Sequence, residues 1–199
     1  MTKSALRQHF LAQRRSLSAE DIEGRSVQIS NQLFSLFLTN TTSGNLHIFL
    51  PIVRQNEVNT WHIVHRIWQD FPAIRIAVSV SNTITNQLSH YVLTPETSLI
   101  VNGWGVPEPR PEDGCAIAID QLDIVLVPLL AFDLHGHRVG YGKGYYDRFL
   151  VQCRPDCQKI GLSLFNPIDL IADTEPTDIR LNACITPEQT YWFTRELSF

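Results

Sequence analysis

The sequence predicts an α/β protein with a mostly parallel sheet covered by helices. Residues 46–50 and 74–80 are short apolar runs typical of buried strands. Between them, Asn59 or Thr60 can cap a helix that runs to about Phe71, so the order is strand, helix, strand. Such a succession makes a right-handed crossover between parallel strands. Residues 124–132 are apolar on both alternating faces, as central strands buried under helices on each side tend to be.

Two helices are expected before the sheet. Residues 3–15 contain good helix formers without Gly or Pro. Ser18, followed by Asp21, resembles a capping box that opens a second helix. The apolar residues of that helix recur at helical spacing; they are Ile22, Ile29, Leu33, Phe34 and Phe37.

The remaining elements complete one α/β domain over residues 1–199. Residues 39–45 form a polar loop before the first strand, which Pro51 stops. Residues 160–165 and 183–186 are further strands, and residues 87–93 add an antiparallel edge.

Composition excludes several classes of function. Sixteen Lys and Arg against twenty Asp and Glu give a formal net charge of −4, so we expect no nucleic-acid partner. Residues 1–15 lack the apolar run of a secretory signal, and no apolar run is long enough to span a membrane. The four scattered cysteines suggest neither disulfides nor a zinc site. We therefore expect a cytoplasmic protein with free thiols, monomeric or, as the alternative, a homodimer.

The densest chemical signal follows residues 124–132. Gly140, Gly142 and Gly144 alternate there, so backbone amides can approach an anion without obstruction by Cβ atoms. Arg138 and Lys143 add positive charge. The spacing matches neither a Walker A loop nor GxGxxG, so the segment indicates a phosphate cradle of another kind, with a glycine-rich hairpin as the alternative.

Acidic and basic residues near this segment extend the hypothesis. Asp147 can hold a magnesium ion that bridges phosphates, or it can simply favour a helix N-terminus. Lys3, Arg7 and Arg14 share one face of the first helix. Such a stripe is usually solvated surface, but a phosphate cradle gives it an anion to meet.

Three loop features carry weaker signals. Glu57 follows the first strand, where loop glutamates are mostly exposed to solvent. Trp104 lies between two glycines, which suits either a stacking surface or a core plug. His135 and His137 have no third metal ligand nearby, which favours a polar turn.

Together these segments resemble the 5-formyltetrahydrofolate cyclo-ligase family, also called 5,10-methenyltetrahydrofolate synthetase. Residues 127–147 look like the signature of that family nearly throughout. Lys3-Ser-Ala-Leu-Arg7 is similar to its N-terminal ATP motif and Glu57-Val-Asn-Thr60 to its substrate loop. Residues 102–109 resemble its Trp-containing loop, and the likeness extends from residue 3 to about residue 186.

The resemblance implies a three-layer α/β/α fold and a ring closure that depends on ATP and Mg²⁺. The catalytic residues it implies are Lys143, Arg138 and Glu57. The ATP-binding residues are Lys3, Arg7, Arg138, Gly140, Tyr141, Gly142, Lys143, Gly144, Tyr145 and Tyr146. The folate-binding residues are Ile52, Glu57, Trp104, Tyr145 and Tyr146, and the metal contacts are Asp147 and Asp178.

The chemistry expected from the resemblance is activation of a formyl oxygen by phosphorylation, since that oxygen is otherwise a poor leaving group. Release of ADP and phosphate would yield 5,10-methenyltetrahydrofolate. One alternative is a protein that binds folate or nucleotide without turnover. Another is a relative of phosphosugar isomerases or acyltransferases, which has no need of the basic N-terminal stripe or of Trp104.

Overall fold

One seven-stranded sheet organises the chain in the computed structural model, which describes residues 1–38 and 43–193. Its strands are β1 (Gly44–His47), β2 (Ile74–Asn82), β3 (Gln87–Leu93), β6 (Ile124–Pro128), β9 (Gln158–Leu162), β10 (Ala183–Ile185) and β11 (Thr190–Trp192). The spatial order is β11-β10-β9-β6-β1-β2-β3. The five central strands pair in parallel, and β3 and β11 are antiparallel edges.

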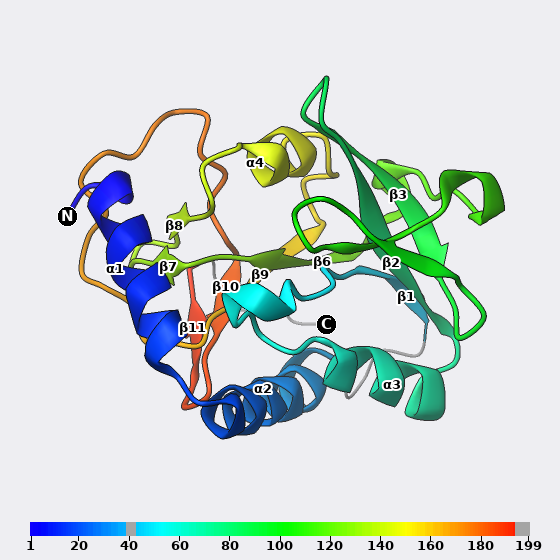
Figure 1. Ribbon diagram of the computed structural model, residues 1–199, viewed down its shortest axis with the longest axis horizontal. Helices are drawn as coiled ribbons and strands as arrows, with labels where there is room; N and C mark the ends of the chain where they lie inside the picture. Colours follow the sequence, from blue (N-terminus) through cyan, green and yellow to red (C-terminus); the bar gives the residue numbers. More distant parts are fainter. Residues whose placement is uncertain (39–42, 194–199) are drawn as a thin grey trace.

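Helices cover both faces of this sheet, as the sequence predicts. They are α1 (Lys3–Ser16), α2 (Ala19–Leu33), α3 (Trp61–Asp70) and α4 (Tyr145–Leu150). Figure 1 shows α2 and α3 beneath the sheet and α4 above it, while α1 lies at one side. The prediction of a three-layer α/β/α fold is therefore confirmed.

Short elements link these layers. A π-helical turn η1 (Phe34–Leu38) continues α2, and the 3₁₀ turns are η2 (Val53–Gln55), η3 (Pro111–Asp113) and η4 (Ile119–Gln121). Two small hairpins, β4 (Leu99–Val101) with β5 (Pro107–Pro109) and β7 (Ala131–Phe132) with β8 (Arg138–Val139), stand outside the large sheet.

The predicted helix starts are confirmed by their capping contacts. The Ser18 hydroxyl accepts from the Asp21 amide at 3.0 Å, and Asp21 Oδ2 accepts from the Ser18 amide at 3.1 Å. This reciprocal pair satisfies amides that have no partner inside α2. Asn59 Oδ1 accepts from the Trp61 amide at the start of α3, where Thr60 is the N-cap.

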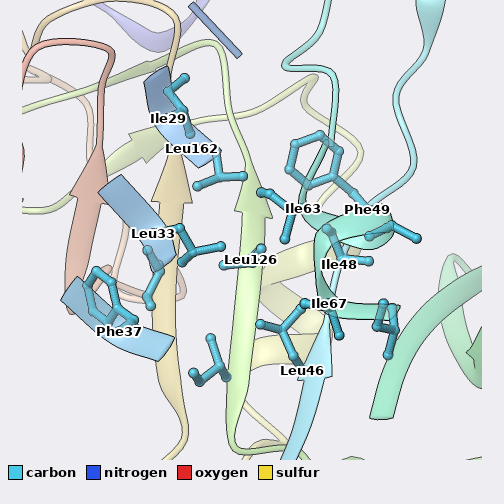
Figure 2. Close-up of a cluster of buried hydrophobic side chains, with 14 of the residues drawn as sticks. Ile29, Leu33, Phe37, Leu46, Ile48, Phe49, Ile63, Ile67, Leu126 and Leu162 are labelled. Carbon is cyan, nitrogen blue, oxygen red and sulfur yellow. The ribbon is translucent and has the colours of Figure 1, made fainter. Parts of the chain in front are cut away.

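The larger core lies between the sheet and the layer of α2 and α3. Figure 2 shows Ile29, Leu33 and Phe37 facing Leu126 and Leu162 of the sheet. All five are at most 3% exposed. On the opposite face, apolar side chains of α4 pack on β6 and its neighbours. Burial on both faces is why residues 124–127 read as a continuous apolar run.

The connections leave a crevice at the carboxyl ends of two central strands. From β1 the chain moves to β2 and β3 on one side, and later to β6, β9 and β10 on the other. The order therefore reverses between β1 and β6. Open α/β sheets bind ligands at such a reversal, because the loops that follow the two strands diverge there.

Several predicted boundaries were wrong. The strand predicted at residues 124–132 ends at Pro128, since proline has no N–H to continue the ladder, and Ala131–Phe132 pairs with Arg138–Val139 instead. The first strand, predicted at 46–50, is Gly44–His47; residues 39–42 of the predicted loop lie outside the described residues.

Other strands were shifted or missed. The strands predicted at 160–165 and 183–186 are Gln158–Leu162 and Ala183–Ile185, and the one at 74–80 extends to Asn82. The β4–β5 hairpin and β11 were not predicted, because three-residue strands are too short to show a period.

Two exclusions from composition have structural counterparts. All four cysteines are free thiols, which confirms that prediction. Across residues 1–38 and 43–193, no helix has the length and apolar character needed to cross a membrane.

Packing around β9 gives a test of the core. A Cβ at Gly161 would lie 2.7 Å from side-chain atoms of Leu129 and Leu181 and 3.0 Å from Cys184 Sγ. We expect Gly161→Ala to lower the free energy of unfolding by about 1–3 kcal/mol through overpacking. The matched variant is Gly24→Ala on the exposed face of α2, where no atom lies within 4 Å. Gly24→Ala should raise the free energy of unfolding by about 0.5–1 kcal/mol. Urea denaturation of both variants measures the free energy of unfolding. An equal change in the two variants would contradict the packing described around Gly161.

Candidate functional site

A cavity of about 380 Å³ opens at the carboxyl ends of β1, β2 and β6. This volume lies in the usual range for small-molecule sites. Every residue that the sequence singled out for ATP, folate or metal lines it; these are Lys3, Arg7, Ile52, Glu57, Trp104, Arg138, Gly140, Tyr141, Gly142, Lys143, Gly144, Tyr145, Tyr146, Asp147 and Asp178. Segments more than 170 residues apart in the chain thus meet at one place.

The glycine-rich segment forms one wall of the cavity. It follows the β7–β8 hairpin and leads into α4. Gly142 has φ +91° and Gly144 has φ +68°, a left-handed conformation that side chains with a Cβ rarely adopt. The Arg7 guanidinium lies against this turn, where its Nε donates to the Gly140 carbonyl at 2.9 Å. The first helix is thereby fixed to the loop.

Two ion pairs line the same wall. Arg138 donates to Asp147 Oδ1 at 2.7 Å and to the Ile179 carbonyl. Lys3 Nζ lies 2.5 Å from Asp178 Oδ2. The Ile179 amide also donates to Asp147 Oδ1 at 3.2 Å, which places the segment of Asp178 beside Asp147. Two cation–carboxylate pairs therefore lie close together at the cavity.

The Lys3–Asp178 pair lowers the pKa of Asp178. Burial by itself raises the pKa of Asp178, but the hydrogen bonds from Lys3 and from the Glu175 amide outweigh burial and hold the pKa below its usual value. Asp178 is therefore ionised and able to accept from a cation or ligate a metal ion.

Glu57 is buried. The interpretation of Glu57 as a solvent-exposed loop glutamate was therefore wrong. Its side chain is 4% exposed. Oε1 accepts from the Tyr141 hydroxyl at 2.7 Å, and Oε2 accepts from the Ile52 amide at 2.7 Å. Burial raises the pKa of Glu57, and the Arg14 guanidinium 4.0 Å away opposes that rise. The contact to Tyr141 joins the residue expected to bind folate to the loop expected to bind ATP.

The basic stripe on α1 is not solvated surface. Lys3 and Arg7 reach the cavity, whereas Arg14 is buried beneath it. Arg14 donates to the Tyr141 hydroxyl at 3.0 Å and to the Leu129 carbonyl. Sequence spacing placed the three residues on one face but gave no sign that Arg14 supports the site from below.

Trp104 also lines the cavity and is 37% exposed. Its ring meets Tyr145 edge to face, with centroids 5.8 Å apart. The Trp104 carbonyl accepts from Arg54 at 2.7 Å. The partial exposure of Trp104 and its contact with Tyr145 favour the hypothesis of an aromatic stacking surface over that of a side chain buried in the core.

Five polar lining residues carried no signal that singled them out in the sequence. They are Arg54, Gln55, Ser79, Ser81 and Glu108. Arg54 comes from η2 and the serines from the end of β2, so only the crossing of loops over the sheet brings them together. The Ser81 amide donates to Glu108 Oε1 at 3.0 Å, which ties β5 to β2.

His135 and His137 form the polar turn that was favoured over a metal site. Asp133 Oδ1 accepts from both histidine amides, at 2.9 and 3.0 Å. Within residues 1–38 and 43–193, no group of three or more His, Cys, Asp or Glu side chains is arranged to hold a metal.

Solved structures share this fold. A 5,10-methenyltetrahydrofolate synthetase from Mycoplasma pneumoniae superposes with a TM-score of 0.74 at 24% identity, covering 94% of this chain and 99% of that one. A 5,10-methenyltetrahydrofolate synthetase from Aquifex aeolicus superposes with a TM-score of 0.73 at 26% identity, covering 100% and 96%.

Sequence comparisons agree. The 5-formyltetrahydrofolate cyclo-ligase of Mycoplasma pneumoniae is 28% identical over 94% of this chain and 100% of its own. That of Escherichia coli strain K12 is 24% identical over 89% and 96%. The model of the 5-formyltetrahydrofolate cyclo-ligase family matches residues 1–187. The chain therefore belongs to this family of ligases.

Proposed function

We propose that this enzyme converts 5-formyltetrahydrofolate to 5,10-methenyltetrahydrofolate, using ATP with Mg²⁺ and releasing ADP and phosphate. One observation carries the proposal. A single cavity is lined both by cations and glycines and by aromatic and apolar side chains, and the hydrogen bond between Tyr141 and Glu57 lies among them. Such a cavity suits a triphosphate beside a pterin ring.

In the first step the formyl oxygen attacks the γ-phosphorus of ATP, and the bond between that phosphorus and the bridging oxygen breaks to release ADP. Charge on the transferring oxygens must be neutralised and the reacting groups held in line. Lys143 and Arg138 line the cavity and serve this, together with Arg7 and Lys3. The turn at Gly142 and Gly144 lets the backbone approach the phosphates.

In the second step N10 of the folate attacks the activated formyl carbon, and the carbon–oxygen bond breaks to release phosphate. The proton of N10 leaves with the phosphate. Glu57 holds the pterin side of the substrate, since its carboxylate is fixed in the cavity wall by Tyr141 and the Ile52 amide. Ile52, Trp104, Tyr145 and Tyr146 enclose the ring.

The residues present fit a magnesium ion that bridges phosphates. Magnesium binds through one or two carboxylates, substrate phosphates and water more often than through an all-protein cage. Asp147 and Asp178 are two such carboxylates on adjacent segments. When bound there, the ion neutralises charge on the phosphate oxygens. In the structure without ligands these carboxylates pair with Arg138 and Lys3.

Turnover is tested by mixing the protein with 5-formyltetrahydrofolate, ATP and Mg²⁺. We expect the near-ultraviolet absorbance of the methenyl product, with one ADP and one phosphate formed for each product molecule. Omission of ATP is the control and should abolish product. Tight binding of both substrates without product would favour the sequestering alternative and contradict the proposal.

Lys143→Ala tests the phosphate-facing wall. Because a point charge on the transferring phosphoryl group is lost, we expect kcat/KM for ATP to fall by about 100-fold. The matched control is Arg15→Ala, an exposed cation of α1 outside the cavity, which should leave this value within about twofold. Initial rates at limiting ATP measure both. Equal rates for Lys143→Ala and the unmutated enzyme would refute the role of Lys143.

Asp147→Asn tests the metal site. The amide keeps an acceptor for Arg138 but loses the charge, so the Mg²⁺ concentration for half-maximal rate should rise by at least about tenfold. Asp70→Asn, an exposed change at the end of α3, is the control. Mg²⁺ titration of initial rates measures the effect, and an unshifted titration would remove Asp147 from the proposed metal contacts.

A further inference from the structure

Three polar side chains form a row across neighbouring strands beside the cavity. They are His47 of β1, Ser79 of β2 and His90 of β3. His47 Nε2 lies 2.8 Å from Ser79 Oγ, and His90 Nδ1 lies 3.4 Å from the same oxygen. Both histidines are buried, at 0% and 4% exposure, whereas Ser79 lines the cavity. The family resemblance assigned no role to any of them.

Phe149 of α4 closes the row on its buried side. Its ring centroid lies 4.2 Å from that of His90 and 4.9 Å from that of His47. Burial lowers the pKa of His90 to about 4, and burial together with His90 lowers the pKa of His47 well below its usual value. Both imidazoles are therefore neutral at neutral pH, and each carries one N–H.

The position of those two hydrogens decides what Ser79 offers to a ligand. His47 Nδ1 and His90 Nε2 are buried without a hydrogen-bond partner. If the Ser79 hydroxyl donated to one histidine, the hydrogen of that ring would sit on its unpartnered nitrogen. Buried N–H groups without partners are rarer than unpaired acceptors. Only when both histidines donate to Ser79 Oγ is no ring N–H group buried without a partner.

With both lone pairs of Ser79 Oγ occupied, its only free group is the O–H, and the cavity lies on its open side. We propose that Ser79 is a substrate-contacting residue that donates a hydrogen bond to a carbonyl oxygen of the bound folate, with His47 and His90 as positioning residues. This inference rests on the proposed function. A carbonyl is favoured over phosphate, because the groups that orient Ser79 are neutral rings and not cations.

The first test determines which ring nitrogen of His47 and of His90 carries the hydrogen. Long-range ¹H–¹⁵N correlation spectra distinguish the two neutral histidine tautomers, and the signals are assigned with a His90→Gln variant. We expect the Nε2–H tautomer for His47 and the Nδ1–H tautomer for His90. Either histidine in the opposite tautomer would overturn the proposal, since Ser79 would then donate to that ring. This result does not depend on turnover.

The second test measures affinity by calorimetry, with 5-formyltetrahydrofolate in the absence of ATP. Ser79→Ala should raise the Kd by about tenfold, as expected for one lost hydrogen bond, and leave the Kd of ATP unchanged. Ser79→Thr keeps the hydroxyl and should stay within about threefold of the unmutated Kd. Ser89→Ala, an exposed serine of β3 outside this cavity, is the matched control.

The outcomes separate the two proposals. An unchanged folate Kd in Ser79→Ala overturns the role of Ser79, and so does an equal loss of folate and ATP affinity, which would indicate a structural effect. An unmutated enzyme that binds folate but forms no product contradicts the proposed turnover alone. The tautomers and the Ser79→Ala effect still decide the inference in that case.

Discussion

The buried carboxylate of Glu57 is the constraint around which the site is built. A buried charge is costly unless it is hydrogen-bonded or paired. Glu57 meets that requirement with Tyr141 from the glycine-rich loop, the Ile52 amide from the loop after β1, and Arg14 from α1. Because three segments must converge to satisfy one group, their positions are fixed relative to each other. The glycine-rich loop, the loop after β1 and α1 are held together beside the cavity as a result.

The sheet makes that convergence possible. The reversal of strand order between β1 and β6 sends the loops after them in different directions from adjacent starting points. Pro128 ends β6 in the ladder, and the chain then leaves the sheet to form the β7–β8 hairpin. The glycine-rich turn is carried on that hairpin, and the Arg7 contact to Gly140 pins α1 against it.

Sequence patterns predicted most of the fold and the membership of the site, but not its internal contacts. Periodicity located α2 and α3, because burial on one face leaves a period. Continuous apolar runs located β1, β2 and β6, because central strands are buried on both faces. Both signals missed β4 and β5, which are too short. The glycines and Lys143 were visible as local composition. The burial of Glu57 and Arg14 was not, since Tyr141, which contacts both side chains, lies 84 residues from Glu57 and 127 residues from Arg14 and only the fold brings them together.

Under the proposed function, an acidic chain binds a polyanion, and the charges around the cavity are consistent with this. The net charge of −4 acts weakly here, because screening at physiological ionic strength limits charge effects to about 8 Å. Within that range Lys3 is paired with Asp178 and Arg138 with Asp147. Under the proposed function, Lys3 and Arg138 would face phosphate oxygens, and Asp147 and Asp178 would hold Mg²⁺. Each of these four charged groups would then exchange one partner for another and keep a partner of opposite charge.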